Sequence, residues 1–134
     1  MTTETTETKT RTITLTDRPP VRIREEQWPV IAHGLHRAHD GQVECQANRT
    51  WKTDIRVRQH EDGRSIVYGT YDYDSAWQGE RGVDARDGVL LDAGEDLVAA
   101  IRSVGASMAE AGGDDHRIAE AVRQCIADLP AEEL

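Results

Sequence analysis

Two runs of alternating apolar and polar residues flank Asp62-Gly63 and predict a β-hairpin with strands over residues 52–60 and 64–73. Asp-Gly is a favoured two-residue hairpin loop, because both central residues of that turn adopt positive φ. This loop would place Val57 opposite Tyr68. Side chains alternate between the faces of a strand, so four of them face the core: Ile55, Val57, Ile66 and Tyr68. The opposite face carries five basic or aromatic side chains: Lys52, Arg56, Arg58, Tyr71 and Tyr73.

Shorter patterns precede the hairpin. Residues 12–16 and 21–24 alternate and predict two short strands that can pair across a proline turn. A different spacing follows, in which apolar residues recur at positions i, i+3, i+4 and i+7, as on one face of a helix. The residues with this spacing are Trp28, Ile31, Ala32 and Leu35. We therefore expect a short helix near residues 28–39.

The segments after the hairpin change from loop to helix. Residues 74–87 are rich in charge and glycine and predict a loop, and the apolar run 88–91 suits a strand or the approach to a helix. Two amphipathic patterns follow, one from Leu97 to Met108 and one from Ile118 to Leu129, and predict two helices. Strands first and helices last are typical of an α+β fold. We expect a small antiparallel sheet of four to six strands with the two C-terminal helices packed on it.

Composition indicates one folded unit. The chain has 134 residues, which is the length of a single domain that can bury a core. Residues 1–10 are rich in Thr and Glu and too polar to bury anything, so we expect a disordered tail followed by a single α+β domain over residues 11–134. The start of the chain resembles no secretion signal, and no apolar run has membrane-spanning length, so we expect a cytoplasmic protein without a membrane segment.

Charge is distributed unevenly. The net charge is −9; residues 1–60 contain 10 Lys and Arg against 8 Asp and Glu, and residues 61–134 contain 6 against 17. Affinity for nucleic acid depends on neutralising phosphates, so a chain this acidic is repelled by nucleic acid at long range. Direct nucleic-acid binding would need a local basic patch that overcomes the field of the whole molecule.

The basic, aromatic face of the hairpin has three explanations. It can be an ordinary solvent-exposed face, on which Arg stems lie over apolar rings. It can be a contact surface for a phosphate backbone or an acidic partner, through charge and stacking. Arg56 and Arg58 can also balance the chain's own carboxylates, such as Asp54 or the acidic stretch 72–96. We favour internal charge balance and place an external partner second.

The acidic stretch is the second candidate contact surface. It contains eight carboxylates: Asp72, Asp74, Glu80, Asp84, Asp87, Asp92, Glu95 and Asp96. Their spacing does not match a calcium-binding EF-hand loop. The ordinary interpretation is a solvated loop and helix start. The functional interpretation is a negative surface that imitates a phosphate backbone and docks a basic partner.

Histidine spacing invites a metal hypothesis. His33, His36 and His39 form the pattern H-x-x-H-x-x-H, with Cys45 or His60 as further ligand candidates. On a helix, however, each step of three residues rotates a side chain by about 60° from the one before, so three histidines converge poorly on one ion. We treat His33, His36 and Cys45 as weak candidates and expect neither a metal nor another cofactor.

The leading expectation is a non-enzymatic binding or regulatory protein that acts through protein–protein contact. The chain contains no nucleophile elbow, phosphate-binding loop, dinucleotide fingerprint or zinc-protease motif. Eight residues are the candidate partner contacts: Arg56, Arg58, Tyr71, Tyr73, Asp72, Asp74, Asp84 and Asp87. A sharper variant is an inhibitor whose acidic surface occupies a nucleic-acid channel of a basic partner. The alternatives are direct nucleic-acid binding through the hairpin face and a metal-dependent enzyme centred on His33 and His36.

Overall fold

The computed structural model describes residues 9–40, 49–75 and 81–131. These ranges contain six strands, a single 3-10 turn at Glu25–Gln27 and two helices. The strands are β1 (Thr10–Ile13), β2 (Val21–Arg24), β3 (Val30–Asp40), β4 (Arg49–Gln59), β5 (Ser65–Ser75) and β6 (Val83–Leu91), and the helices are α1 (Leu97–Glu110) and α2 (Asp115–Asp128).

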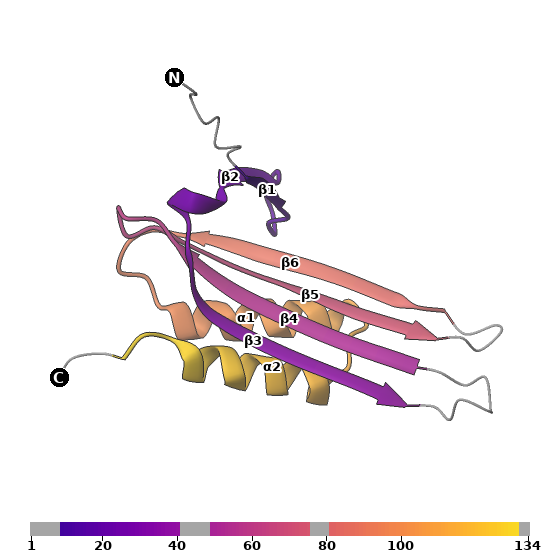
Figure 1. Cartoon of the computed structure of the whole chain (residues 1–134). Coiled ribbons are helices and arrows are strands. Elements are labelled where there is room, and N and C mark those ends of the chain that lie inside the picture. Colours follow the sequence, from indigo (N-terminus) through magenta and orange to yellow (C-terminus); the bar gives the residue numbers. More distant parts are fainter. Residues whose placement is uncertain (1–8, 41–48, 76–80, 132–134) are drawn as a thin grey trace, which may run out of the picture.

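The strands β3, β4, β5 and β6 form an antiparallel sheet in chain order, and α1 and α2 lie side by side across one of its faces (Figure 1). The strands β1 and β2 pair with each other and lie on the other face of the sheet, toward the β4–β5 turn (Figure 1). The predicted α+β class, the hairpin and the two C-terminal helices packed on the sheet are confirmed. Residues 1–8 of the predicted tail lie outside the described residues, and Thr10 already begins β1.

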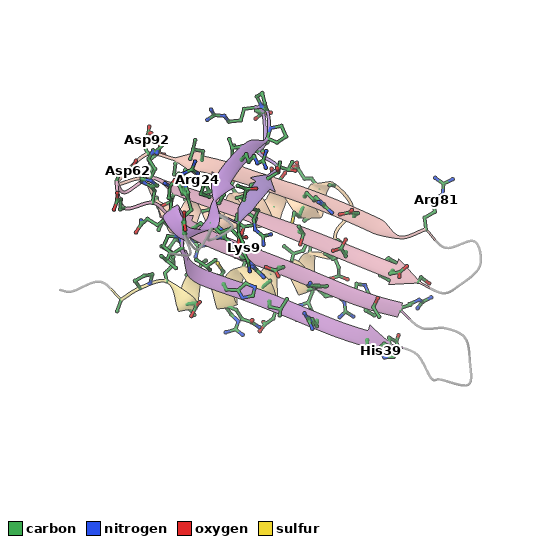
Figure 2. The ribbon with its side chains drawn as sticks, turned by 45° about the horizontal axis from the view of Figure 1, so that its top comes forward. Lys9, Arg24, His39, Asp62, Arg81 and Asp92 are labelled. Atoms are coloured by element: carbon green, nitrogen blue, oxygen red, sulfur yellow. The ribbon has the colours of Figure 1, made fainter. Side chains whose placement is uncertain are left out.

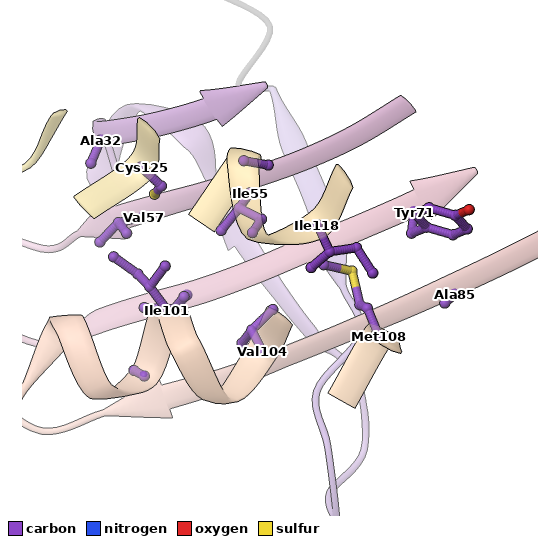
Figure 3. Close-up of a cluster of buried hydrophobic side chains, with 13 residues drawn as sticks. Ala32, Ile55, Val57, Tyr71, Ala85, Ile101, Val104, Met108, Ile118 and Cys125 are labelled. Carbon is purple, nitrogen blue, oxygen red and sulfur yellow. The ribbon is translucent and has the colours of Figure 1, made fainter. Parts of the chain in front are cut away.

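Each helix begins directly after an aspartate that caps it. The side chain of Asp96 accepts a hydrogen bond from the Ala99 N–H, and the side chain of Asp114 does the same for Arg117. Such caps satisfy backbone donors that a helix start leaves without partners. The inner faces of both helices pack on the sheet in one cluster of buried side chains, which includes Ile101, Met108, Ile118 and Cys125 (Figure 3).

The predicted helix near residues 28–39 is wrong, because this segment is the edge strand β3. The apolar spacing mixes residues that serve different parts of the fold. Trp28 lies before the strand, under β1 and β2, whereas Ala32 faces the two helices. Gly34 lies where β3 meets α2: a Cβ built on it would stand 2.0 Å from the backbone oxygen of Ala121 on α2. A glycine here permits the close approach of α2 to the sheet.

The predicted loop over residues 74–87 is also wrong at both ends. The strand β5 continues to Ser75, and β6 already begins at Val83, while residues 76–80 lie outside the described part. Val83 and Ala85 face the helix side, and the alternating charged residues Asp84 and Arg86 point the other way. Alternation over so few residues, in a charged and glycine-containing segment, resembles a loop in the sequence.

The hairpin strands are confirmed, but their predicted register is wrong by one residue. Val57 lies opposite Val67, and Arg56 lies opposite Tyr68. The loop holds three residues, Glu61 to Gly63, because the His60 N–H donates to the Arg64 carbonyl and Gly63 adopts φ of +96°. A three-residue loop with glycine in the left-handed region is a common hairpin connection. The slip turns every β5 side chain to the opposite face from the one predicted.

The predicted pairing of the two N-terminal strands is confirmed, and the pair covers part of the second sheet face. Ile13, Leu15, Ile23 and Trp28 form a small buried cluster with Ile66 of β5. The chain after β1 is also tied to the edge of the sheet, since the Thr16 N–H donates to the Gly88 carbonyl. Figure 2 shows β1 and β2 over the end of the sheet near Asp62 and Asp92.

Candidate functional site

Half of the second sheet face has no described element over it. We call it the open half-face; in Figure 2 it is the part of the sheet that leads toward His39 and Arg81. Alternation along the four strands assigns mainly polar and charged side chains to it. They are His33, Leu35, Arg37, His39, Thr50, Lys52, Asp54, Arg56, Thr70, Asp72, Asp74, Asp84 and Arg86.

Arg58 was predicted as a partner contact and is instead nearly buried, with 5% of its surface exposed. Its Nε donates to the Tyr68 hydroxyl at 2.7 Å, and its Nη1 donates to the Trp28 carbonyl at 3.0 Å. Its Nη2 lies 3.5 Å from a carboxylate oxygen of Glu25. Arg58 therefore joins the segment that carries β1 and β2 to the sheet, and it is not available to a partner.

Tyr71 and Tyr73 lie on the helix side of the sheet, which corrects their predicted place beside Arg56 and Arg58. Tyr71 is only 3% exposed, and burial raises the pKa of its hydroxyl. Tyr73 packs against Trp51 with a distance of 5.2 Å between the ring centroids. The guanidinium of Arg117 lies 3.9 Å from the centroid of the Trp51 ring. These aromatic residues close the end of the core, and the basic, aromatic face that the sequence suggested is not formed.

Arg56 does lie on the open half-face, where it has a partner from its own strand. Its Nε donates to Asp54 at 3.1 Å, and this hydrogen bond raises the pKa of the guanidinium. The same Asp54 oxygen lies 2.9 Å from Nε2 of His33 on β3. Internal charge balance thus accounts for both arginines, although Arg58 faces Glu25 and neither arginine pairs with the described residues of the 72–96 stretch.

Three of the four predicted acidic contacts lie together at the far end of β5 and β6. We call Asp72, Asp74 and Asp84 the acidic strip; they line one hollow together with Tyr73, Gly82 and Val83. The fourth, Asp87, is buried, and its carboxylate accepts a hydrogen bond from the Gly88 N–H at 2.9 Å. Asp87 therefore has a local structural role.

The acidic strip holds two carboxyl groups directly opposite each other, Asp72 on β5 and Asp84 on β6. Partial burial raises the pKa of the Asp72 carboxyl, and the negative charge of Asp84 raises it further. Lys52 lies opposite Asp72 on β4, but within the described residues no ion pair joins the two. Arg86 approaches Asp84 at 3.5 Å, with both side chains mostly exposed. The positive charges of Arg86 and Lys52 lower the pKa of Asp72, but burial and Asp84 outweigh them, so the net shift stays upward.

Replacing Asp72 with Asn should stabilise the protein at neutral pH by up to about 1 kcal/mol, because it removes one of two like charges that face each other across the strands. A raised pKa in the folded state means that ionised Asp72 opposes folding above that pKa and is neutral below the pKa of the unfolded chain, near 3.9. The gain in thermal midpoint should therefore shrink as the pH falls and vanish below about pH 3. Thermal unfolding of both proteins across this pH range measures it.

The matched control for that series is Asp74→Asn. Asp74 lies two residues after Asp72 on β5, and the described register gives it no partner on β6. The thermal midpoint of Asp74→Asn should stay close to wild type at every pH. A gain for Asp72→Asn that grows in acid, or an equal gain for Asp74→Asn, would contradict the assignment of repulsion to the Asp72–Asp84 pair.

The histidine hypothesis fails on geometry. His33 and His36 are three residues apart on a strand, so their side chains point to opposite faces and cannot hold one ion. Cys45 lies outside the described residues. Among the described residues, no three metal-ligating side chains gather closely enough to hold an ion. Cys125 is also unsuited to nucleophilic chemistry, because burial raises the pKa of its thiol to about 12.

Sequence reasoning missed two contributors to these surfaces. The His33–Asp54 contact joins neighbouring strands, and it was hidden because His33 was assigned to a helix. Arg117 over Trp51 joins the start of α2 to β4, and no local pattern in either segment signals such a contact. Both depend on how distant elements pack.

The comparisons give no relative from which a role could be transferred. No protein-family model matches the chain, and no curated protein or solved structure matches it significantly. Among the described residues, neither helix combines the length and apolar character needed to cross a bilayer.

Proposed function

We propose that this chain is a non-enzymatic binding protein that contacts a protein partner through the open half-face, with the acidic strip receiving a basic segment of that partner. The observation that carries the proposal is the Asp72–Asp84 pair. Like charges directly opposite each other cost stability in a sheet. A cationic side chain from a partner would relieve this repulsion, and the repulsion energy released would add to the free energy of binding.

The rest of the open half-face supports a contact of this kind. It is a broad sheet surface with charged side chains on all four strands. Arg56 and Asp54 pair with each other there, whereas in the acidic strip the charge of Asp84 raises the pKa of Asp72. Complementary charge across an interface mainly steers association and selects the partner. A basic partner that normally holds nucleic acid fits this chemistry, and the protein would then act as an inhibitor by imitating a phosphate backbone.

Direct nucleic-acid binding is less well supported than protein contact. The predicted surface for it depended on Arg58 and on two tyrosines, and Arg58 and Tyr71 are buried. On the open half-face, the remaining cations share the surface with Asp54 and the acidic strip. A phosphate backbone would meet carboxylates there.

Affinity capture from a lysate of the source cells tests the proposal. The bait is the full chain in three forms: wild type, the strip variant Asp72→Asn/Asp74→Asn/Asp84→Asn, and the control variant Glu26→Gln/Glu61→Gln/Asp92→Asn. The control removes the same charge from exposed residues near the β4–β5 turn, roughly 30 Å away along strands of 3.3 Å per residue. We expect a basic protein to be captured by the wild type and the control and lost with the strip variant.

Competition separates the inhibitor from other binding proteins. Added double-stranded DNA should displace the captured partner if the acidic strip occupies its nucleic-acid channel. Capture that DNA leaves unchanged would remove the inhibitor variant of the proposal. Capture by the strip variant equal to wild type would remove the acidic strip as the contact.

A further inference from the structure

The outer surface of the helix pair contains a groove that the fold itself does not fill. It encloses about 420 Å³ and is lined mainly by apolar side chains of both helices. Four residues form its floor and walls: Gly105, Ala109, Ile118 and Val122. The helices lie close here, since a Cβ built on Gly105 would stand 2.6 Å from a methyl carbon of Val122. This groove faces away from the sheet, and therefore away from the open half-face.

The two ends of the groove carry opposite charges. Arg102 lies one turn from Gly105 toward the start of α1, and Asp115 lies two turns from Val122 toward the start of α2. Because the two helices are antiparallel, these displacements run in opposite directions (Figure 1), and the charges stand roughly 15 Å apart along the groove at 1.5 Å per residue. Both side chains are exposed, and within the described part of the chain neither has an ion-pair partner.

The third charged residue at the groove is already neutralised. Arg123 forms a bidentate ion pair with Glu120 of its own helix. The groove therefore presents one unpaired cation at one end, one unpaired anion at the other and apolar surface between them. Such a surface is complementary to its own copy turned by 180°.

We infer that the outer face of α1 and α2 is the interface of a two-fold symmetric homodimer. A two-fold axis that lies in the plane of the interface, perpendicular to the line joining Arg102 and Asp115, brings Arg102 of one protomer to Asp115 of its partner, and the same contact repeats by symmetry. The alanines at the groove allow the helices of the two protomers to approach closely, so the apolar walls leave water together. Both open half-faces remain on the outside of this dimer and free to bind, so the inference is independent of the proposed function.

Charge reversal tests this arrangement, because symmetry fixes the outcome of each variant. In Arg102→Asp, an Asp meets Asp115 of the partner twice, and in Asp115→Arg, an Arg meets Arg102 twice. Both variants should be monomers in sedimentation velocity at concentrations where the wild type has twice its chain mass of 14.9 kDa. The doubly reversed protein Arg102→Asp/Asp115→Arg should again be a dimer, and an equimolar mixture of the two single variants should form a heterodimer.

Two lysine substitutions, one inside the groove and one outside it, give a second test with a matched change of charge. Asp115 also lies in the first turn of α2, where an acidic residue favours the helix dipole, so the thermal midpoint of each variant is recorded. Ala119→Lys places a charge within the groove, whereas Ala127→Lys places one at an exposed position of the same helix outside it. We expect Ala119→Lys to be monomeric and Ala127→Lys to remain dimeric.

Two results would overturn the inference. A wild type that stays at the mass of one chain up to submillimolar concentration excludes the homodimer. A dimer that survives Arg102→Asp and Ala119→Lys lies on another surface. Capture of a basic partner by the open half-face does not depend on either result, so the homodimer and the proposed function can fail separately.

Discussion

Substituting alanine for Gly34 should destabilise the protein by about 3 kcal/mol or more and lower the thermal midpoint by about 10 °C or more. The new methyl group would stand 2.0 Å from the Ala121 carbonyl oxygen and 2.7 Å from the Cys125 backbone nitrogen. Both obstacles are helix backbone, which cannot rotate away as a side chain can. The substitution therefore pushes α2 off β3 along the edge of the sheet. Thermal and urea unfolding followed by circular dichroism measure the loss.

Gly69→Ala is the matched control for this substitution. Gly69 is also a strand glycine beneath a helix, but its nearest obstacle is the terminal methyl of Met108 at 2.8 Å, the far end of a flexible side chain, and its nearest backbone contact is the Asp54 carbonyl oxygen at 3.2 Å. Methionine adapts readily to small changes of shape, so Gly69→Ala should cost only about 1 kcal/mol. Equal losses for the two variants would contradict the close packing of α2 on β3.

Removing the Arg58 side chain should cost about 2–4 kcal/mol and release β1 and β2 from the sheet. Arg58→Ala leaves the Trp28 carbonyl without the donor that it has in a buried hydrogen bond, which is costly, and it removes the 2.7 Å hydrogen bond to the part-buried Tyr68 hydroxyl. It also removes the cation that faces Glu25. Amide hydrogen exchange should therefore accelerate over residues 10–28 well before the four-stranded sheet is affected.

Arg56→Ala is the control, two residues away on the same face of β4. The Arg56 side chain is 33% exposed and its pair with Asp54 is a partly solvated contact within one strand. Such pairs contribute less than about 1 kcal/mol. If Arg58→Ala and Arg56→Ala had the same stability and the same amide hydrogen exchange at β1 and β2, Arg58 would not hold this segment.

The contrast between these two arginines illustrates what the sequence could predict. Alternation correctly placed Arg56 and Arg58 on one face of β4, opposite Ile55 and Val57, because β4 is long and regular. It could not tell that β1 and β2 cover one arginine and leave the other open. That difference arises from contacts between segments some thirty residues apart, which a local pattern does not contain.

The hairpin register was predicted wrongly because of the local sequence of the loop. Asp62-Gly63 is an adequate two-residue loop, and the structure instead uses Glu61, Asp62 and Gly63 as a three-residue loop. The carboxylate of Asp62 accepts a hydrogen bond from the Arg64 N–H at 2.9 Å, and this contact supports the longer loop. One residue of difference moved Tyr71 from a predicted contact surface into the core.

For the acidic strip, the sequence could predict only an excess of carboxylates and not their arrangement. The sequence showed that the carboxylates of the 72–96 stretch outnumber its cations, but it assigned most of that stretch to a loop. Only the pairing of β5 with β6 brings Asp72 opposite Asp84 and buries Asp87. The partners of these residues depend on the antiparallel register, which the missed strand β6 concealed.

Titration of the captured partner against the three forms of the chain tests the central claim most directly. The measurement is the dissociation constant by calorimetry, at low and at physiological salt, for the wild type, the strip variant and the charge-matched control variant. If the acidic strip is the contact, the strip variant binds at least about tenfold more weakly than the wild type, a loss of about 1.4 kcal/mol, and its affinity depends less on salt. Equal affinity of the strip variant and the wild type, or an equal loss in the control variant, would contradict it.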